Sequence, residues 1–190
     1  MWPFKPRIPI TPEDIEWTEV NILWLKEQFG QLPNIITLSK DNFPFEFHGR
    51  EVDIKQFLDF VCTQMRVPVD NLDLRFFDPM PLIDGIRMEV EEDLPEGIYY
   101  QKENGRQVIE FNNEQLVNLT SVTATIAHEV AHIKLMTLGD PEEDEEFLTD
   151  LTAIYFGFGI FIANSTFSFD QWQDDYHQKW SMKKTGYLPI

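Results

Sequence analysis

The chain has 190 residues, of which 43% are hydrophobic, including 16 Phe and 5 Trp, and this suffices for one domain with a sizeable core. Its 33 acidic and 15 basic residues give a formal net charge of −18, which argues against nucleic acid or an anionic membrane as a partner. The single cysteine, Cys62, excludes an internal disulfide and fits a reducing cytoplasm. Residues 1–7 lack the apolar core of a signal peptide, so we expect a cytoplasmic protein.

Two helices are predicted in the N-terminal part of the chain. Thr11 can cap the first helix, Pro12 occupies its first position, and Gly30 ends it. The second helix is predicted over residues 53–65. Because Cys62 lies in its apolar stretch, we expect a buried and inert thiol.

Three strands are predicted next. Residues 72–77 alternate between apolar and polar side chains, and so do residues 97–101 and 107–111. The last two are joined through Asn104 and Gly105, and an Asn-Gly pair is typical of a tight β-hairpin. We therefore expect a small antiparallel sheet just before the next helix.

That helix is predicted over residues 118–138. Apolar side chains recur in it at helical spacing, Thr120 or Ser121 can cap its start, and Gly139 follows its last apolar residue. It contains the H-E-x-x-H motif His128-Glu129-Val130-Ala131-His132. Residues four apart lie one turn apart on the same face of a helix, so both imidazoles can bind one metal ion.

This motif predicts a catalytic metal site. Glu129 lies about 100° round the helix from His128, close enough to reach a metal-bound water. Two histidines and one further protein ligand would leave a fourth zinc position open for that water, which is the arrangement of a hydrolase. The alternative is a coincidental pair of histidines on a solvated helix face. The helical context and the spacing of two of only 4 histidines favour the metal site.

Residues 124–132 resemble the active-site helix of zincin metallopeptidases. The metzincin continuation H-x-x-G-x-x-H is excluded, because Leu135 and Leu138 occupy the positions of its glycine and third histidine. Glu146 and Asp150 instead have the spacing Glu-x-x-x-Asp of the thermolysin (gluzincin) type, after a shorter gap. That resemblance implies that Glu146 binds zinc and that Asp150 orients a ligand histidine.

Helix geometry leaves the third ligand open between Glu146 and Asp150. Asp140, followed by a proline and two glutamates, is typical of a helix start. A helix that begins there carries Glu146 about 9 Å along its axis, level with His132, and Asp150 then lies beside His128. A later start would make Asp150 the better ligand, and we favour Glu146. The other carboxylates of this acidic segment are expected to be solvated.

The remaining chemistry-bearing residues are weaker candidates. Residues 154–163 form an apolar run of about ten residues, short of the ~20 that span a bilayer, and are expected to be a buried helix under the metal site. Tyr155 and His177, and also Tyr176, are candidates to stabilise the oxyanion of a tetrahedral intermediate, with a core or surface role as the alternative. His48 is expected to be a loop histidine and not a ligand.

Residues 107–165 resemble a group of uncharacterised bacterial H-E-x-x-H proteins and, more weakly, the bacterial metallopeptidases that cleave transcriptional repressors. The resemblance implies an α+β, zincin-like fold with a small antiparallel sheet, an active-site helix and a second ligand-bearing helix. In zincins, the corresponding edge strand of the sheet binds extended substrate; the alternative here is an ordinary sheet edge, and the sequence does not separate the two. We expect one domain over residues 1–190, comprising an N-terminal elaboration (1–96), the hairpin and ligand helices (97–165) and a C-terminal tail (166–190).

The predicted function is that of a zinc-dependent metallopeptidase. Zn²⁺ held by His128, His132 and Glu146 would activate a water, with Glu129 as the general base, on a peptide or protein substrate. The alternative is a non-catalytic or partner-gated regulatory domain with a structural zinc site. The sequence indicates neither the identity of the substrate nor the oligomeric state.

Overall fold

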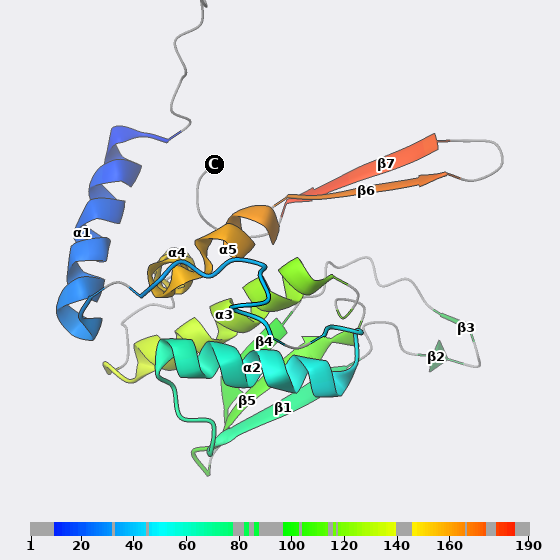
Figure 1. Ribbon diagram of the computed structural model, residues 1–190, viewed down its shortest axis with the longest axis horizontal. Helices are drawn as coiled ribbons and strands as arrows, with labels where there is room; N and C mark the ends of the chain where they lie inside the picture. The colour runs from blue at the N-terminus through cyan, green and yellow to red at the C-terminus, as the bar shows by residue number, and fades with distance from the viewer. Residues whose placement is uncertain are drawn as a thin grey trace, which may run out of the picture.

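The structure is a computed structural model, and its topology is α+β. It describes residues 10–31, 33–44, 46–77, 82–83, 86–87, 97–102, 104–113, 116, 118–139, 146–165, 167–173 and 178–184. Within these residues the chain forms four helices, the last of which is broken, and a mixed three-stranded sheet beside two small strand pairs. Helices occupy two layers above the three-stranded sheet (Figure 1).

Short polar side chains stabilise the starts of the first two helices. Helix α1 (Pro12–Phe29) starts at Thr11, which shares a reciprocal capping box with Asp14, as the sequence predicts for the cap. Helix α2 (Glu51–Met65) begins two residues before its predicted start. The reason is Asp53 in its first turn, whose carboxylate accepts hydrogen bonds from the backbone N–H groups of residues 48 and 50.

The three-stranded sheet has the order β1-β5-β4, with β1 at Leu72–Phe77, β4 at Gly97–Gln101 and β5 at Gln107–Asn112. Strands β4 and β5 form the predicted antiparallel hairpin, with Gly105 at φ +79° in its turn. The prediction of a purely antiparallel sheet is wrong, because β1 pairs with β5 in parallel. The side-chain alternation of a strand does not encode its direction, and the long connection after β1 allows a parallel return.

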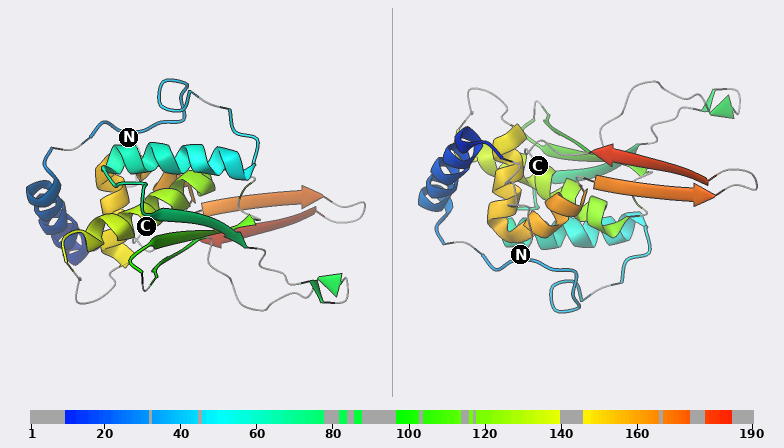
Figure 2. Two further views of the ribbon diagram at one scale, coloured as in Figure 1. Left: turned by 90° about the horizontal axis from the view of Figure 1, so that it is seen from below. Right: turned by 90° about the horizontal axis from the view of Figure 1, so that it is seen from above.

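Two further strand pairs complete the described topology. Strands β2 (Leu82–Ile83) and β3 (Ile86–Arg87) are antiparallel, and so are β6 (Phe167–Gln173) and β7 (Gln178–Lys184). The β6–β7 hairpin extends away from the helical layers (Figures 1 and 2). The segment predicted as a C-terminal tail therefore contains regular structure.

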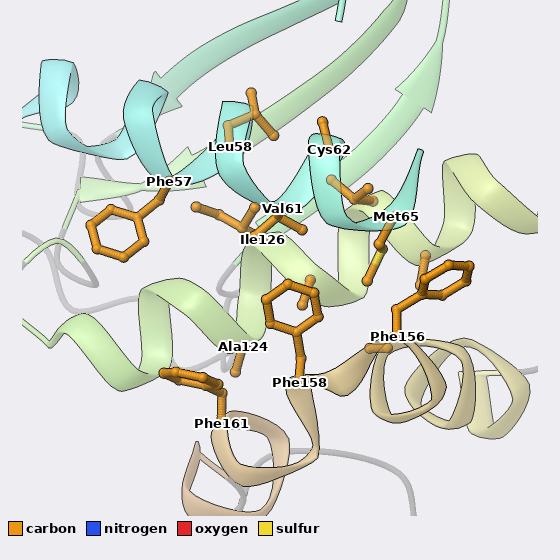
Figure 3. Close-up of a cluster of buried hydrophobic side chains, with 14 of the residues drawn as sticks. Phe57, Leu58, Val61, Cys62, Met65, Ala124, Ile126, Phe156, Phe158 and Phe161 are labelled. Carbon is orange, nitrogen blue, oxygen red and sulfur yellow. The ribbon is translucent and has the colours of Figure 1, made fainter. Parts of the chain in front are cut away.

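Helix α3 (Leu119–Met136) carries the motif and lies in the middle of the molecule. Its cap is Asn118, and not Thr120 or Ser121 as predicted, because the helix already begins at Leu119 and the Asn118 side chain accepts from the N–H groups of both of those residues. Helices α2 and α3 form the layer next to the sheet, and the last helical run packs on their far side (Figure 2). Phe57 of α2 and Phe158 and Phe161 of that run enclose α3 between apolar side chains (Figure 3).

The last helical run consists of α4 (Glu146–Ala153), a wide π-type turn η2 (Ile154–Phe158) and α5 (Gly159–Ser165). By length and composition the run could cross a membrane, but 61% of its most apolar window is buried inside the protein. Burial of the predicted apolar helix is thus confirmed, but its continuity is not. Gly157 breaks it at φ +101°, where its carbonyl accepts from the N–H of Ile36.

Candidate metal centre

Helices α3 and α4 bring three metal-binding side chains together. His128 and His132 lie one turn apart on α3, and Glu146 lies in the first turn of α4. His128 Nε2 is 3.2 Å from His132 Nε2 and 3.0 Å from Glu146 Oε2, and the third separation, His132 Nε2 to Glu146 Oε2, is 3.6 Å. These residues can hold a metal ion.

The spacing of the three atoms fits a small divalent cation. A tetrahedral zinc ion with ligands at 2.0–2.2 Å holds its ligand atoms about 3.3–3.6 Å from one another, and the observed separations of 3.0, 3.2 and 3.6 Å lie within about 0.3 Å of that range. Glu146 Oε2 is buried, and its nearest polar neighbours are the two Nε2 atoms, at 3.0 and 3.6 Å. A buried carboxylate oxygen is stabilised by a positive charge beside it, which a protonated His128 or a bound metal ion can supply.

Two neighbouring residues of α4 orient the histidine rings. Asp150 Oδ1 lies 2.9 Å from His128 Nδ1, and Thr149 Oγ1 lies 3.4 Å from His132 Nδ1. Because a carboxylate only accepts, the neutral His128 ring carries its proton on Nδ1 and presents the Nε2 lone pair to Glu146. The Thr149 hydroxyl can accept from Nδ1–H of His132 in the same tautomer. The structure thus places Glu146, and not Asp150, with the two Nε2 atoms. The expected start of α4 at Asp140 lies outside the described residues.

The electrostatics of the site favour a positive charge at its centre. Burial alone would lower the pKa of His128, but its hydrogen bonds with Asp150 and Glu146 and the charge of Glu129 outweigh burial and raise this pKa to about 10. The same pairing with His128 lowers the pKa of Glu146 against the opposing effect of burial. Without a metal, the site therefore binds a proton, and a bound divalent cation would take the place of that charge.

Tyr99, on the outer strand β4, is a residue of this site that the sequence analysis missed. Its ring stacks on the His132 imidazole at a centroid distance of 6.1 Å and an interplanar angle of 8°. Its hydroxyl donates a hydrogen bond to the Met136 sulfur, one turn further along α3. The predicted hairpin was the only sequence signal that could place a β4 side chain against α3. Thr149 was missed as a partner of His132 although it directly precedes Asp150.

The other predicted residues are placed as follows. Glu129 is buried, with 5% of its surface exposed, and its charge acts on His128. Tyr155 is buried, and its hydroxyl donates to the carbonyl of Gly30, so that hydrogen is already engaged. His177 and Tyr176 lie outside the described residues.

The structure also describes His48, which is expected not to be a ligand, and Cys62, which is expected to be a buried inert thiol. His48 lies in a loop beside Glu46 and Asp53. Cys62 is fully buried in α2, and burial raises the pKa of its thiol to about 12 (Figure 3). The expected burial of this thiol is confirmed, and its inertness stays a prediction.

The cluster is partly open to solvent. The side chains of His128, His132 and Glu146 are 16%, 13% and 31% exposed. A structural zinc site is closed by four protein ligands, whereas the described part of the chain supplies three at this point. The point where these three side chains meet is therefore accessible from solvent.

No family model, curated protein or solved structure matches this chain. The chemistry of the site is therefore inferred from its geometry, its donor set and its exposure.

Proposed function

We propose that this chain is a zinc-dependent metallopeptidase of the zincin type, with His128, His132 and Glu146 as the metal ligands and Glu129 as the general base. The observation that carries the proposal is the convergence of two Nε2 atoms and one buried carboxylate oxygen at mutual distances of 3.0–3.6 Å. Three such ligands from two helices, with Glu129 next to the first, are the composition of a catalytic site and not of a closed one.

Zinc at this position would supply Lewis acidity toward a peptide carbonyl and toward water. Glu129 would accept the proton of the attacking water and deliver it to the leaving amine. Its 5% exposure suits this task, because a buried carboxylate next to a cation exchanges protons without competition from bulk solvent. Asp150 holds His128 in the ligating tautomer, and Tyr99 and Thr149 hold the plane of the His132 ring.

The outer strand β4 supports a peptide or protein as the substrate. In the described sheet β4 pairs only with β5, so its other edge can accept an extended chain as an added strand. Tyr99 of this strand touches His132, which would bring such a chain next to the metal ligands. The charge of −18 and the single cysteine are consistent with a one-domain cytoplasmic enzyme that does not act on nucleic acid or at an anionic membrane.

The test compares zinc content and peptide hydrolysis in the wild type, Glu129→Gln and His132→Ala. We expect about one zinc per chain in the wild type and in Glu129→Gln, and its loss in His132→Ala. Cleavage of a proteome-derived peptide library, read by mass spectrometry, should occur only with the wild type. Full turnover in zinc-loaded Glu129→Gln would disprove the role of Glu129. Zinc in the wild type without cleavage of any peptide would favour a structural site instead.

A further inference from the structure

We propose that the groove between α2 and the outer edge of β1 binds an extended segment of a partner protein as an added β-strand, and that this segment carries two basic side chains four residues apart with an apolar one between them. The groove has a volume of about 760 Å³ and runs between α2 and β1. Strand β1, which lines the groove, is the opposite edge of the sheet from β4 (Figure 1). The groove is therefore separate from the metal centre, whose neighbouring strand is β4.

The backbone of β1 is open on this side. Gln107 donates its N–H to the carbonyl of Asn71, and Leu72 pairs with Gln107 in the parallel register. In a parallel ladder, every second residue of a strand turns its N–H and C=O groups to the same neighbouring strand. Leu74 and Phe76 alternate with the residues of β1 that bond to β5, so they turn these groups away from β5. In the part of the chain that the structure describes, no strand pairs with that edge. These backbone groups select an occupant that is itself an extended chain.

The floor of the groove is apolar. Leu72, Leu74 and Phe76 are partly buried against the core, and Leu58 of α2 closes the floor between the helix and the strand. Val52 of α2 is 52% exposed at the rim. One apolar side chain of an added strand, on the face toward α2, would be buried here, which gives such a strand affinity beyond its backbone hydrogen bonds.

The charges on α2 define the rest of the occupant. Glu51, Lys55 and Asp59 are exposed, line the groove and follow one another at intervals of four residues, so the charge along this helix face runs negative, positive, negative. The two carboxylates are about 12 Å apart along the helix axis, at 1.5 Å per residue. Same-face residues four apart in a strand are separated by about 13 Å. Two basic side chains at that spacing therefore match Glu51 and Asp59.

The other charges of the groove are already compensated. Asp73 forms ion pairs with Lys102 and Arg106 in the hairpin, and Arg75 lies 3.6 Å from Glu110. The acidic excess of the groove is therefore the excess on α2. The net charge of −18 adds a long-range attraction for a basic segment and disfavours a second copy of this chain as the occupant.

The test uses a short fluorescein-labelled peptide in which lysine, threonine, valine, threonine and lysine follow one another, read by fluorescence anisotropy with the full chain. The matched peptide has the same composition but carries its lysines three residues apart, on opposite faces of the strand. We expect saturable binding of the first peptide and about tenfold weaker binding of the second. Two N-methylated forms of the first peptide, each with one alternate set of its amides blocked, complete the comparison. Only one of these sets of amides faces β1, so only one of the two methylated peptides should fail to bind.

Variants of the chain locate the site. Glu51→Lys/Asp59→Lys should weaken binding about tenfold, whereas Glu16→Lys/Glu27→Lys on α1 makes the same change in net charge and should alter binding by less than about twofold. Equal effects of the two double variants, or equal binding of the two methylated peptides, would overturn the proposal. A wild-type dimer that Glu51→Lys/Asp59→Lys dissociates would overturn it in favour of a second copy. The readout requires neither metal nor hydrolysis, so it is independent of the proposed enzymatic function.

Discussion

Replacing Asp150 with asparagine is expected to weaken zinc binding far more than replacing its neighbour Thr149 with valine. Both residues contact an Nδ1 atom of a ligand histidine from α4, but the two contacts differ. The Asp150 oxygen is 2.9 Å from His128 and belongs to a charged group whose side chain is 3% exposed. The Thr149 oxygen is neutral and 3.4 Å from His132.

The magnitudes follow from this difference. Removing a carboxylate that holds a metal-bound histidine typically lowers metal affinity 10- to 100-fold, which is about 1.4–2.8 kcal/mol. The buried position of Asp150 puts Asp150→Asn within that range. A neutral contact at the outer limit of hydrogen bonding is worth about 0.5–1 kcal/mol, so Thr149→Val should lower affinity less than about fivefold.

Affinity should be measured by competition with a chromogenic chelator at one fixed neutral pH. Asp53→Asn is the matched control, because Asp53 is as buried as Asp150 but caps α2 away from the site, and its zinc affinity should equal that of the wild type. An Asp150→Asn variant with wild-type affinity, or a Thr149→Val variant that loses more than Asp150→Asn, would refute the assignment of the two partners.

Three further predictions concern groups away from the metal centre. Because burial raises the pKa of the Cys62 thiol to about 12, iodoacetamide should label it only after unfolding, and rapid labelling of the native protein would contradict this. Gly157→Ala should lower the free energy of unfolding, measured in urea, by about 2–4 kcal/mol, because φ at this residue is +101° and the added Cβ would collide with a loop carbonyl. Gly159→Ala is the control: φ at this residue is −56°, so its free energy of unfolding should fall clearly less. Hydrogen bonds from Arg50 hold the pKa of Asp53 at about 2, below the unfolded value of about 3.9, so the stability it contributes is complete above that unfolded value and is lost as the pH falls toward 2. Asp53→Asn should therefore flatten the acid limb of the pH–stability curve, and an unchanged limb would exclude this role.

Local features of the fold were predictable because their causes are local. The capping box at Thr11, the Asn-Gly hairpin and the helix around His128 each depend on residues a few positions apart. The same holds for the pairing of His128 with His132, since the helix repeat alone places them on one face. The sequence alone therefore fixes two of the three proposed ligands and leaves the third between Glu146, which it favours, and Asp150.

The rest depends on contacts between distant segments. Glu146 and Asp150 lie one turn apart, and only the docking of α4 on α3 decides which carboxylate meets the Nε2 atoms. Gly157 adopts its positive φ where η2 meets the loop at Asn34, more than a hundred residues earlier. The parallel pairing of β1 with β5 likewise depends on the path of a long connection and not on the alternation of side chains.

Competition between a proton and the metal links the geometry of the site to a measurable property. His128 is held between Asp150 and Glu146, so its pKa is raised to about 10, and below that value its ring is protonated. Zinc binds the neutral ring, so each bound zinc must displace one proton, and apparent zinc affinity should rise about tenfold per pH unit between about pH 6 and 8. Isothermal titration calorimetry in two buffers of different ionisation enthalpy measures the protons released. In Asp150→Asn the pKa of His128 should fall, and the pH dependence should level off at a lower pH. Because weaker proton competition then offsets part of the lost zinc affinity, the difference from the wild type should grow as the pH rises. Zinc binding that is independent of pH in the wild type would mean that the proton and the metal do not share this site.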